Sequence, residues 1–146
     1  MIELDNRTSL EVDFGFIQKI ADFLTQKDIE LVITGSKEMQ DINLAHRNIN
    51  KDTDVLSFPY DDMPMVPLGS IIISSEYVIN KAKELGHSEC DEFALLFIHG
   101  ILHLLGYDHE VDNGEMRDEE ERLIKKFNLP KSLIVRSQND STSRET

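Results

Sequence analysis

The central segment of this sequence reads His99-Gly100-Ile101-Leu102-His103-Leu104-Leu105-Gly106-Tyr107-Asp108-His109, and it holds three of the chain's five histidines. On a helix, residues four apart lie one above the other, so His99 and His103 would point at the same place. Gly106 can take the left-handed conformation that ends a helix and lets the chain turn back with His109. This HxxxHxxGxxH spacing is typical of zinc sites. We therefore predict one zinc ion bound by His99, His103 and His109, with a fourth position open.

The residue after the first histidine distinguishes this segment from the HExxH metallopeptidases. In those enzymes a glutamate at this position acts as the general base. Here the position is Gly100, which cannot accept a proton. The usual route of peptide hydrolysis therefore lacks its base, and the sequence argues against a protease.

Two other interpretations of the histidines stay open. Histidines on an apolar helix are often core residues whose nitrogens are satisfied by hydrogen bonds. The second interpretation is a closed structural zinc site, with Cys90, the only cysteine, or Asp108 as fourth ligand. The helical offset, the glycine and the third histidine together favour the open site over both.

Length and composition limit the class of protein. We expect residues 1–136 of the 146-residue chain to form a single metal-dependent hydrolase domain, and residues 137–146 to be a disordered polar tail. One cysteine excludes an internal disulfide, and the N-terminus has no apolar signal segment, so we expect a cytoplasmic protein. The longest apolar run, residues 93–105, is too short to cross a bilayer.

The net charge of −13 comes from 28 acidic residues against 15 lysines and arginines. Sequence-independent binding of nucleic acid depends on basic side chains that displace counterions. The charge therefore argues against a general polyanion binder, although a local basic cleft stays compatible with it. Many of the acids fall within residues 110–121, which we interpret as a solvated helix face.

Hydrophobic periodicity predicts alternating strands and helices. Strands are expected at residues 2–5, 29–34, 54–58, 69–74 and 133–135, and helices at about 12–26, 36–46, 75–86, 89–105 and 113–127. Ser36 and Ser88 are the expected N-caps of the second and fourth helices. The residues expected to face inward in the first strand and second helix are Ile2, Leu4, Met39, Ile42 and Ala45. This order predicts an α+β fold with a small mixed four-stranded sheet, about five helices and the metal-binding helix in the centre.

Further motifs extend the pattern to a known family. Asn43 and Arg47 precede Asp52-Thr53-Asp54-Val55-Leu56-Ser57-Phe58-Pro59, and Leu68-Gly69-Ser70-Ile71-Ile72-Ile73-Ser74 follows. Together with residues 99–109, these blocks resemble the YbeY family of bacterial rRNA-processing endoribonucleases. The resemblance implies a metzincin-like core, one zinc ion per chain held by His99, His103 and His109, and a cleft arginine at Arg47.

The same resemblance implies a single-strand-specific, zinc-dependent endoribonuclease acting in late small-subunit (16S) rRNA 3′ end maturation and ribosome quality control. Its implied partners are rRNA and the ribosomal small subunit, with ribosomal proteins or an assembly GTPase, and neither membrane nor DNA. Two positions depart from the family pattern. Ser70 replaces the usual acid, and Arg117 stands where an aromatic residue often follows Met116.

The chemistry expected of these residues is metal-assisted RNA cleavage, with His99 and Arg47 as the catalytic residues. A zinc ion held by three neutral imidazoles keeps its charge and supplies hydroxide near neutral pH. Arg47 can bind phosphoryl oxygens through its two-pronged guanidinium, whereas without the resemblance it is a solvated helix-end residue. His46 and Ser57 are weaker candidates for substrate contact. The alternatives are a non-catalytic ribosome-assembly factor with a structural metal and a small-molecule metallohydrolase.

Overall fold

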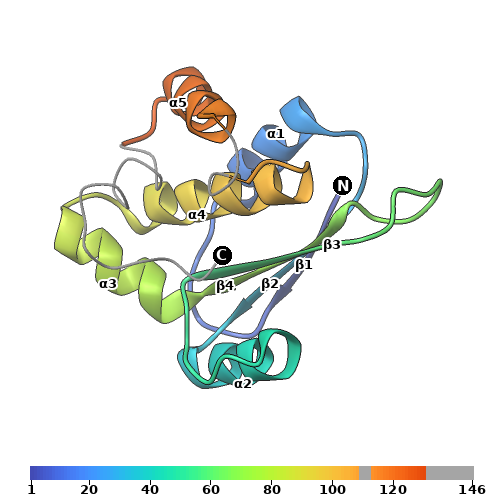
Figure 1. Ribbon diagram of the computed structural model, residues 1–146. Helices are drawn as coiled ribbons and strands as arrows, with labels where there is room; N and C mark the ends of the chain where they lie inside the picture. The colour runs from blue at the N-terminus through green and yellow to red at the C-terminus, as the bar shows by residue number, and fades with distance from the viewer. Residues whose placement is uncertain (109–112, 131–146) are drawn as a thin grey trace.

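A four-stranded sheet lies at the centre of the computed structural model, which describes residues 1–108 and 113–130 (Figure 1). The strands lie in the order β1-β2-β4-β3. Strands β1, β2 and β4 are parallel, whereas β3 is antiparallel to β4 at the edge. The bounds of the strands are β1 Ile2–Asn6, β2 Ile29–Thr34, β3 Val55–Pro59 and β4 Gly69–Ser74. The predicted mixed sheet of an α+β fold is confirmed.

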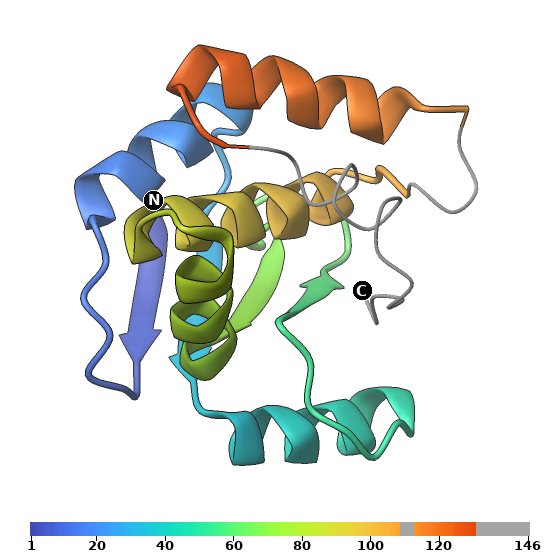
Figure 2. The same ribbon diagram turned by 90° about the vertical axis from the view of Figure 1, so that its left-hand side faces the viewer.

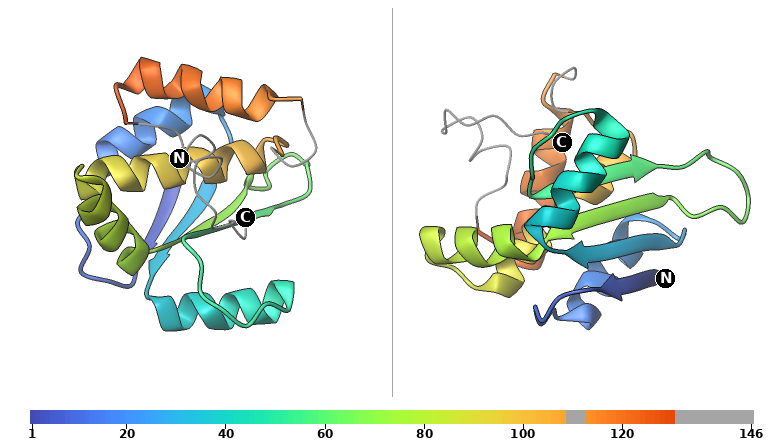
Figure 3. Two further views of the ribbon diagram at one scale, coloured as in Figure 1. Left: turned by 60° about the vertical axis from the view of Figure 1, so that its left-hand side comes forward. Right: turned by 90° about the horizontal axis from the view of Figure 1, so that it is seen from below.

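Helices cover both faces of this sheet. Their bounds are α1 Phe14–Leu24, α2 Ser36–Arg47, α3 Ser75–Leu85, α4 Glu89–Leu104 and α5 Glu115–Phe127. Helices α1, α3, α4 and α5 lie on one side, and α5 is the outermost of them (Figure 2). Helix α2 lies on the other side, across β3 and β4 (Figure 3).

The edge strand β3 contributes side chains to both hydrophobic cores, because successive residues of a strand point to opposite faces of the sheet. Val55 belongs to the large core that includes α4. Leu56 belongs to a small core that it forms with Met39 of α2 and Ile72 of β4. Phe58 packs against that small core, whereas Ser57 contacts α4. Helices α2 and α4 are therefore neighbours of the same strand on opposite faces.

Helix α4 is the buried central helix that its composition predicts. Every residue from Glu92 to Leu102 is buried. Its first turn is capped by Ser88, whose Oγ accepts a hydrogen bond of 3.0 Å from the backbone N–H of Asp91. Gly106 has a φ of 101°, the left-handed conformation expected after this helix. The N-cap and the end of this helix thus follow the predicted pattern.

Three local predictions were wrong. Gly35, not Ser36, is the N-cap of α2, and the backbone N–H of Ser36 donates instead to Glu76 Oε1 of α3, 3.0 Å away. Leu4 is exposed because β1 is an edge strand in which only Ile2 is buried. Ala45 is exposed as well, and the second helix buries Asn43 beside Met39 instead.

Several expectations concern residues outside the described ranges. These are the strand at 133–135, the tail at 137–146 and the position of His109. The single domain at 1–136 likewise stays a prediction. None of the helices formed by the described residues combines the length and apolarity that a bilayer crossing requires.

Candidate metal centre

The histidine pair lies in the second half of α4. His99 is fully buried and His103 is half-buried. Their ring centroids are 4.8 Å apart and the rings are nearly perpendicular, at 78°. Two imidazoles therefore lie one turn apart on one face of the helix, as the four-residue offset predicts.

A buried carboxylate orients the first of these rings. Glu120 Oε2 of α5 lies 2.8 Å from Nδ1 of His99, and both side chains are almost fully buried. An ionised carboxylate only accepts hydrogen bonds, so with Glu120 ionised and the His99 ring neutral, Nδ1 would carry the hydrogen and Nε2 the lone pair. Zinc-binding histidines commonly have this arrangement, with the second ring nitrogen bonded to a carboxylate. The ring nitrogens of the two histidines are therefore suitable ligand atoms for a zinc ion.

Glu120 was missed from the sequence. It is one of four consecutive acids, Asp118 to Glu121, and we interpreted this run as a solvated face. The available signal was its spacing from two apolar residues, since Met116, Glu120 and Leu123 recur at helical intervals. All three are buried in the structure. A carboxylate on the apolar face of an otherwise charged helix is the feature to look for.

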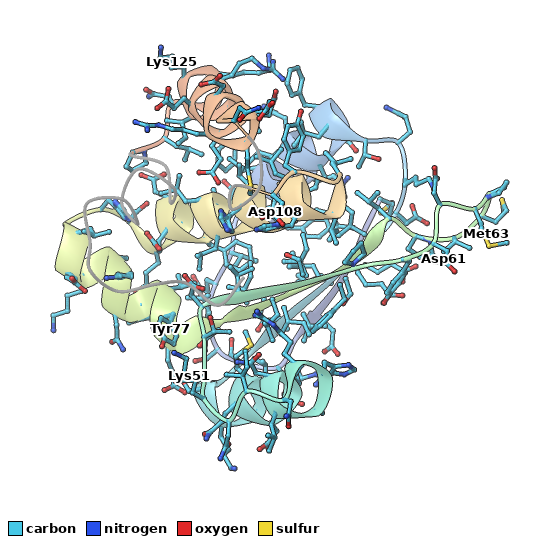
Figure 4. All side chains as sticks on the ribbon, in the orientation of Figure 1. Lys51, Asp61, Met63, Tyr77, Asp108 and Lys125 are labelled. Atoms are coloured by element: carbon cyan, nitrogen blue, oxygen red, sulfur yellow. The ribbon has the colours of Figure 1, made fainter. Side chains whose placement is uncertain are left out.

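The other proposed ligands are placed differently. His109 falls between the two described ranges, and within those ranges no three histidine, cysteine or acidic side chains converge on one point. Asp108, at the end of the first range, lies on the α4 side of the sheet, whereas Lys51 lies on the α2 side (Figure 4). Cys90 is exposed in the first turn of α4, about 14 Å along the helix axis from His99 at 1.5 Å per residue. The structure therefore contradicts Cys90 as a fourth ligand.

Gly100 lies at the contact between α4 and the sheet. A Cβ atom at this position would lie 3.0 Å from Ile71 Cγ2 and 3.3 Å from Ser57 Oγ. The Ser57 hydroxyl donates a hydrogen bond of 3.3 Å to the Gly100 carbonyl. The position that carries the general base in HExxH enzymes thus faces the packed strands, and a side chain there would have to displace Ile71 and Ser57.

Arg47 is exposed at the C-terminal end of α2. Helices α2 and α4 cover opposite faces of the sheet, so Arg47 and the histidine pair belong to helices on opposite sides of it (Figure 1). Its neighbour His46 packs against Phe58 of β3, with ring centroids 5.1 Å apart. The helix that carries Arg47 and the helix that carries the histidines therefore pack on the two faces of the same edge strand.

Asn43 fixes the chain that follows Arg47. Its side chain is fully buried, and Nδ2 donates a hydrogen bond of 2.9 Å to the backbone carbonyl of Lys51. The helix ends at Asn48, which takes a left-handed conformation with a φ of 58°. Asn43 thus holds the turn between α2 and β3, a structural role that explains its place in the motif.

Comparison with known proteins identifies the family. The sequence profile described as Endoribonuclease YbeY matches residues 6–128, a range that includes both histidines of α4, Glu120 and Arg47. The chain belongs to the YbeY family.

Curated YbeY relatives match nearly the whole chain. A protein of Sulfurimonas denitrificans named Endoribonuclease YbeY is 66% identical over 138 residues, which cover 94% of this chain and 99% of the relative. Proteins of the same name from Nautilia profundicola and Campylobacter jejuni are 56% and 59% identical. These two matches cover 95% and 86% of this chain, and 100% and 93% of the relatives.

A solved structure shares the YbeY fold seen here. The solution structure of TM1509 from Thermotoga maritima superimposes with a TM-score of 0.61. It covers 99% of this chain and 98% of its own, at 22% sequence identity. The likeness supports the architecture of the sheet and helices.

Two positions that depart from the expected YbeY pattern have local explanations. Ser70 is buried in β4, in register with Phe58 of the edge strand. Arg117 lies 3.4 Å from Glu121 one turn along α5, as an ion pair on a partly exposed face.

Proposed function

We propose that the protein is a zinc-dependent endoribonuclease that cleaves single-stranded RNA and acts in 16S rRNA 3′ end maturation and ribosome quality control. Membership of the YbeY family supports this proposal, because the curated relatives carry the name endoribonuclease. The structural observation that supports it best is the hydrogen bond between His99 and Glu120, since zinc-binding histidines commonly bond their second ring nitrogen to a carboxylate.

In this proposal, His99, His103 and His109 hold one zinc ion. When bound, the ion supplies a Lewis acid and a hydroxide nucleophile at neutral pH. Glu120 holds the proton at Nδ1 of His99, so that Nε2 is the donor atom. Gly100 and Ser57 keep the helix against the edge strand, which fixes the height of the two rings above the sheet.

Arg47 is proposed to bind a phosphate of the RNA. Its surroundings differ from those of Arg7, Arg117 and Arg122, because each of these three arginines pairs with a carboxylate. Within residues 1–108 and 113–130, no carboxylate forms an ion pair with Arg47. A guanidinium that has no acidic partner can form the two-pronged contact with phosphate that the reaction requires.

The acidic composition favours RNA binding that is assisted by contacts with protein partners. A net charge of −13 repels free polyanions at long range. We therefore propose that the substrate is rRNA within the small subunit, in the cytoplasm, with ribosomal proteins or an assembly GTPase as partners. RNA cleavage by zinc-quantified protein tests the activity. A sample that holds zinc but cuts no RNA, alone or on small subunits, would favour the assembly-factor alternative.

A further inference from the structure

We infer that Glu120 is a positioning residue that fixes the tautomer and orientation of His99 and thereby sets the metal affinity of the site. This inference rests on the proposed zinc site and deepens it. Glu120 is not proposed to touch RNA or the reacting atoms. Its only proposed action is on the His99 ring, through the hydrogen bond of 2.8 Å between Oε2 and Nδ1.

The carboxylate of Glu120 lies in apolar surroundings, where burial of a charged group is unfavourable in free energy. On the inner face of α5 it lies between Met116 and Leu123, which are both fully buried. Its own side chain is 2% exposed, and that of His99 is 0% exposed. Removal of a carboxylate from water is unfavourable unless it is paired and hydrogen-bonded. The contact with His99 supplies such a partner in the middle of the interface between α4 and α5.

The chemistry of the acceptor makes this contact directional. A carboxylate offers no hydrogen, so the bonded nitrogen of a neutral His99 carries one and the opposite nitrogen, Nε2, has the lone pair. A glutamine at the same place has one oxygen and one NH₂ group, so it can either accept from Nδ1 or donate to it. Glu120→Gln therefore preserves size and removes only the enforced tautomer and the charge.

A purely structural role, as a link between two helices, is the competing explanation. The chain contains a second pair of the same kind that provides the comparison. His87 Nε2 lies 2.8 Å from Oε1 of Glu92, which is fully buried at the N-terminal end of α4. That pair joins the turn after α3 to α4, about seven residues or 10 Å along the helix axis from His99. Glu92→Gln therefore disturbs a buried His–Glu pair of α4 outside the proposed metal site.

The experiment measures zinc affinity by competition with a chromophoric chelator, for the parent protein, Glu120→Gln, Glu92→Gln and Glu121→Gln. Glu121 is half-exposed on the same helix as Glu120, so its variant controls for the loss of one charge from α5. The thermal unfolding temperature of each zinc-free protein is measured together with its zinc affinity. We expect a zinc Kd raised about 10- to 100-fold in Glu120→Gln. Glu92→Gln and Glu121→Gln are expected to keep the parent Kd, even where Glu92→Gln unfolds at a lower temperature.

A second measurement does not require metal or a variant that folds. Long-range ¹H–¹⁵N spectra of the zinc-free parent report which nitrogen of each histidine carries the hydrogen. We expect His99 to be the Nδ1–H tautomer, and the Nε2–H tautomer would overturn the inference. If the parent binds zinc and Glu120→Gln binds it with the same Kd, the inference is also overturned. The proposed metal site would stand in that case. A parent that takes up no zinc would instead overturn the zinc site of the proposed function, and with it the inference.

Discussion

The hydroxyl of Ser57 on the edge strand lies 3.3 Å from the carbonyl oxygen of Gly100 on the central helix, and this contact places the histidine helix directly on the sheet. The sheet comes so close that a Cβ at Gly100 would meet Ile71 at 3.0 Å. Glycine at this position therefore allows a close contact with the sheet, besides being the loss of a general base. A larger residue at position 100 would have to displace the side chains of Ile71 and Ser57.

Gly100→Ala is expected to lower the free energy of unfolding by about 1 kcal/mol or more, because overpacking outweighs the gain in helix propensity. The matched control is Gly15→Ala in α1, where the nearest atom to an added Cβ is 3.8 Å away. That variant is expected to gain about 0.5–1 kcal/mol. Urea unfolding of both variants measures the two effects. Equal stabilisation by the two alanines would contradict the close packing at Gly100.

Asn43→Ala is expected to cost about 1–3 kcal/mol, because it removes a fully buried side chain together with its hydrogen bond to the backbone carbonyl of Lys51. Gln40→Ala is the control, since Gln40 makes an exposed hydrogen bond to Asn50 of the same turn. Its expected cost is within about 0.5 kcal/mol. Denaturant midpoints of the two variants give the comparison, and similar values would show that Asn43 does not hold this turn.

Arg47→Ala is expected to lower RNA cleavage by roughly 10²-fold or more, because a charged contact to the phosphate is lost. Zinc content and thermal stability should stay at parent values, since the side chain is exposed. Lys37→Ala serves as the control, because it removes one positive charge from the exposed face of the same helix, where Lys37 pairs with Asp41. Cleavage rates that fall equally in both variants would point to general electrostatics, and unchanged cleavage in Arg47→Ala would remove its assigned role.

Zinc is expected to stabilise the folded protein, because a ligand that binds only the native state shifts the unfolding equilibrium. At free zinc about 100-fold above the Kd the gain is about 2.7 kcal/mol, which raises the Tm by several degrees in a chain of this size. Calorimetry of chelator-treated protein with and without added zinc measures this gain. His103→Ala should show no such response. A zinc-dependent rise of the same size in that variant would place the ion elsewhere.

Much of the fold could be predicted because local signals and tertiary packing agree. Central helix α4 shows this agreement, since its N-cap at Ser88, its apolar length and the left-handed Gly106 are all found where the sequence indicates them. Ser36 was wrongly predicted as a cap because the carboxylate that binds this helix end, Glu76, comes from a helix 40 residues away. Such a partner is invisible to any local pattern.

The candidate site was predicted only in part for the same reason. His99 and His103 lie within one helix, so their offset fixes their relation before any tertiary contact forms. The role of Glu120 depends on how α5 crosses α4, and the relation of Arg47 to the histidines depends on how α2 packs on the other face of the sheet. Both are tertiary relations between segments far apart in the sequence. His109 stays a predicted ligand, since it lies outside the described ranges.

The most direct test of the account is RNA cleavage by zinc-quantified protein beside His103→Ala prepared identically. Single-stranded fragments from the 3′ end of 16S rRNA and the same fragments annealed to a complement are the substrates. The account predicts that the parent cuts the single strands, spares the duplex, and loses activity in His103→Ala. Equal cleavage by parent and His103→Ala would contradict it, because the activity would then not depend on the histidine site.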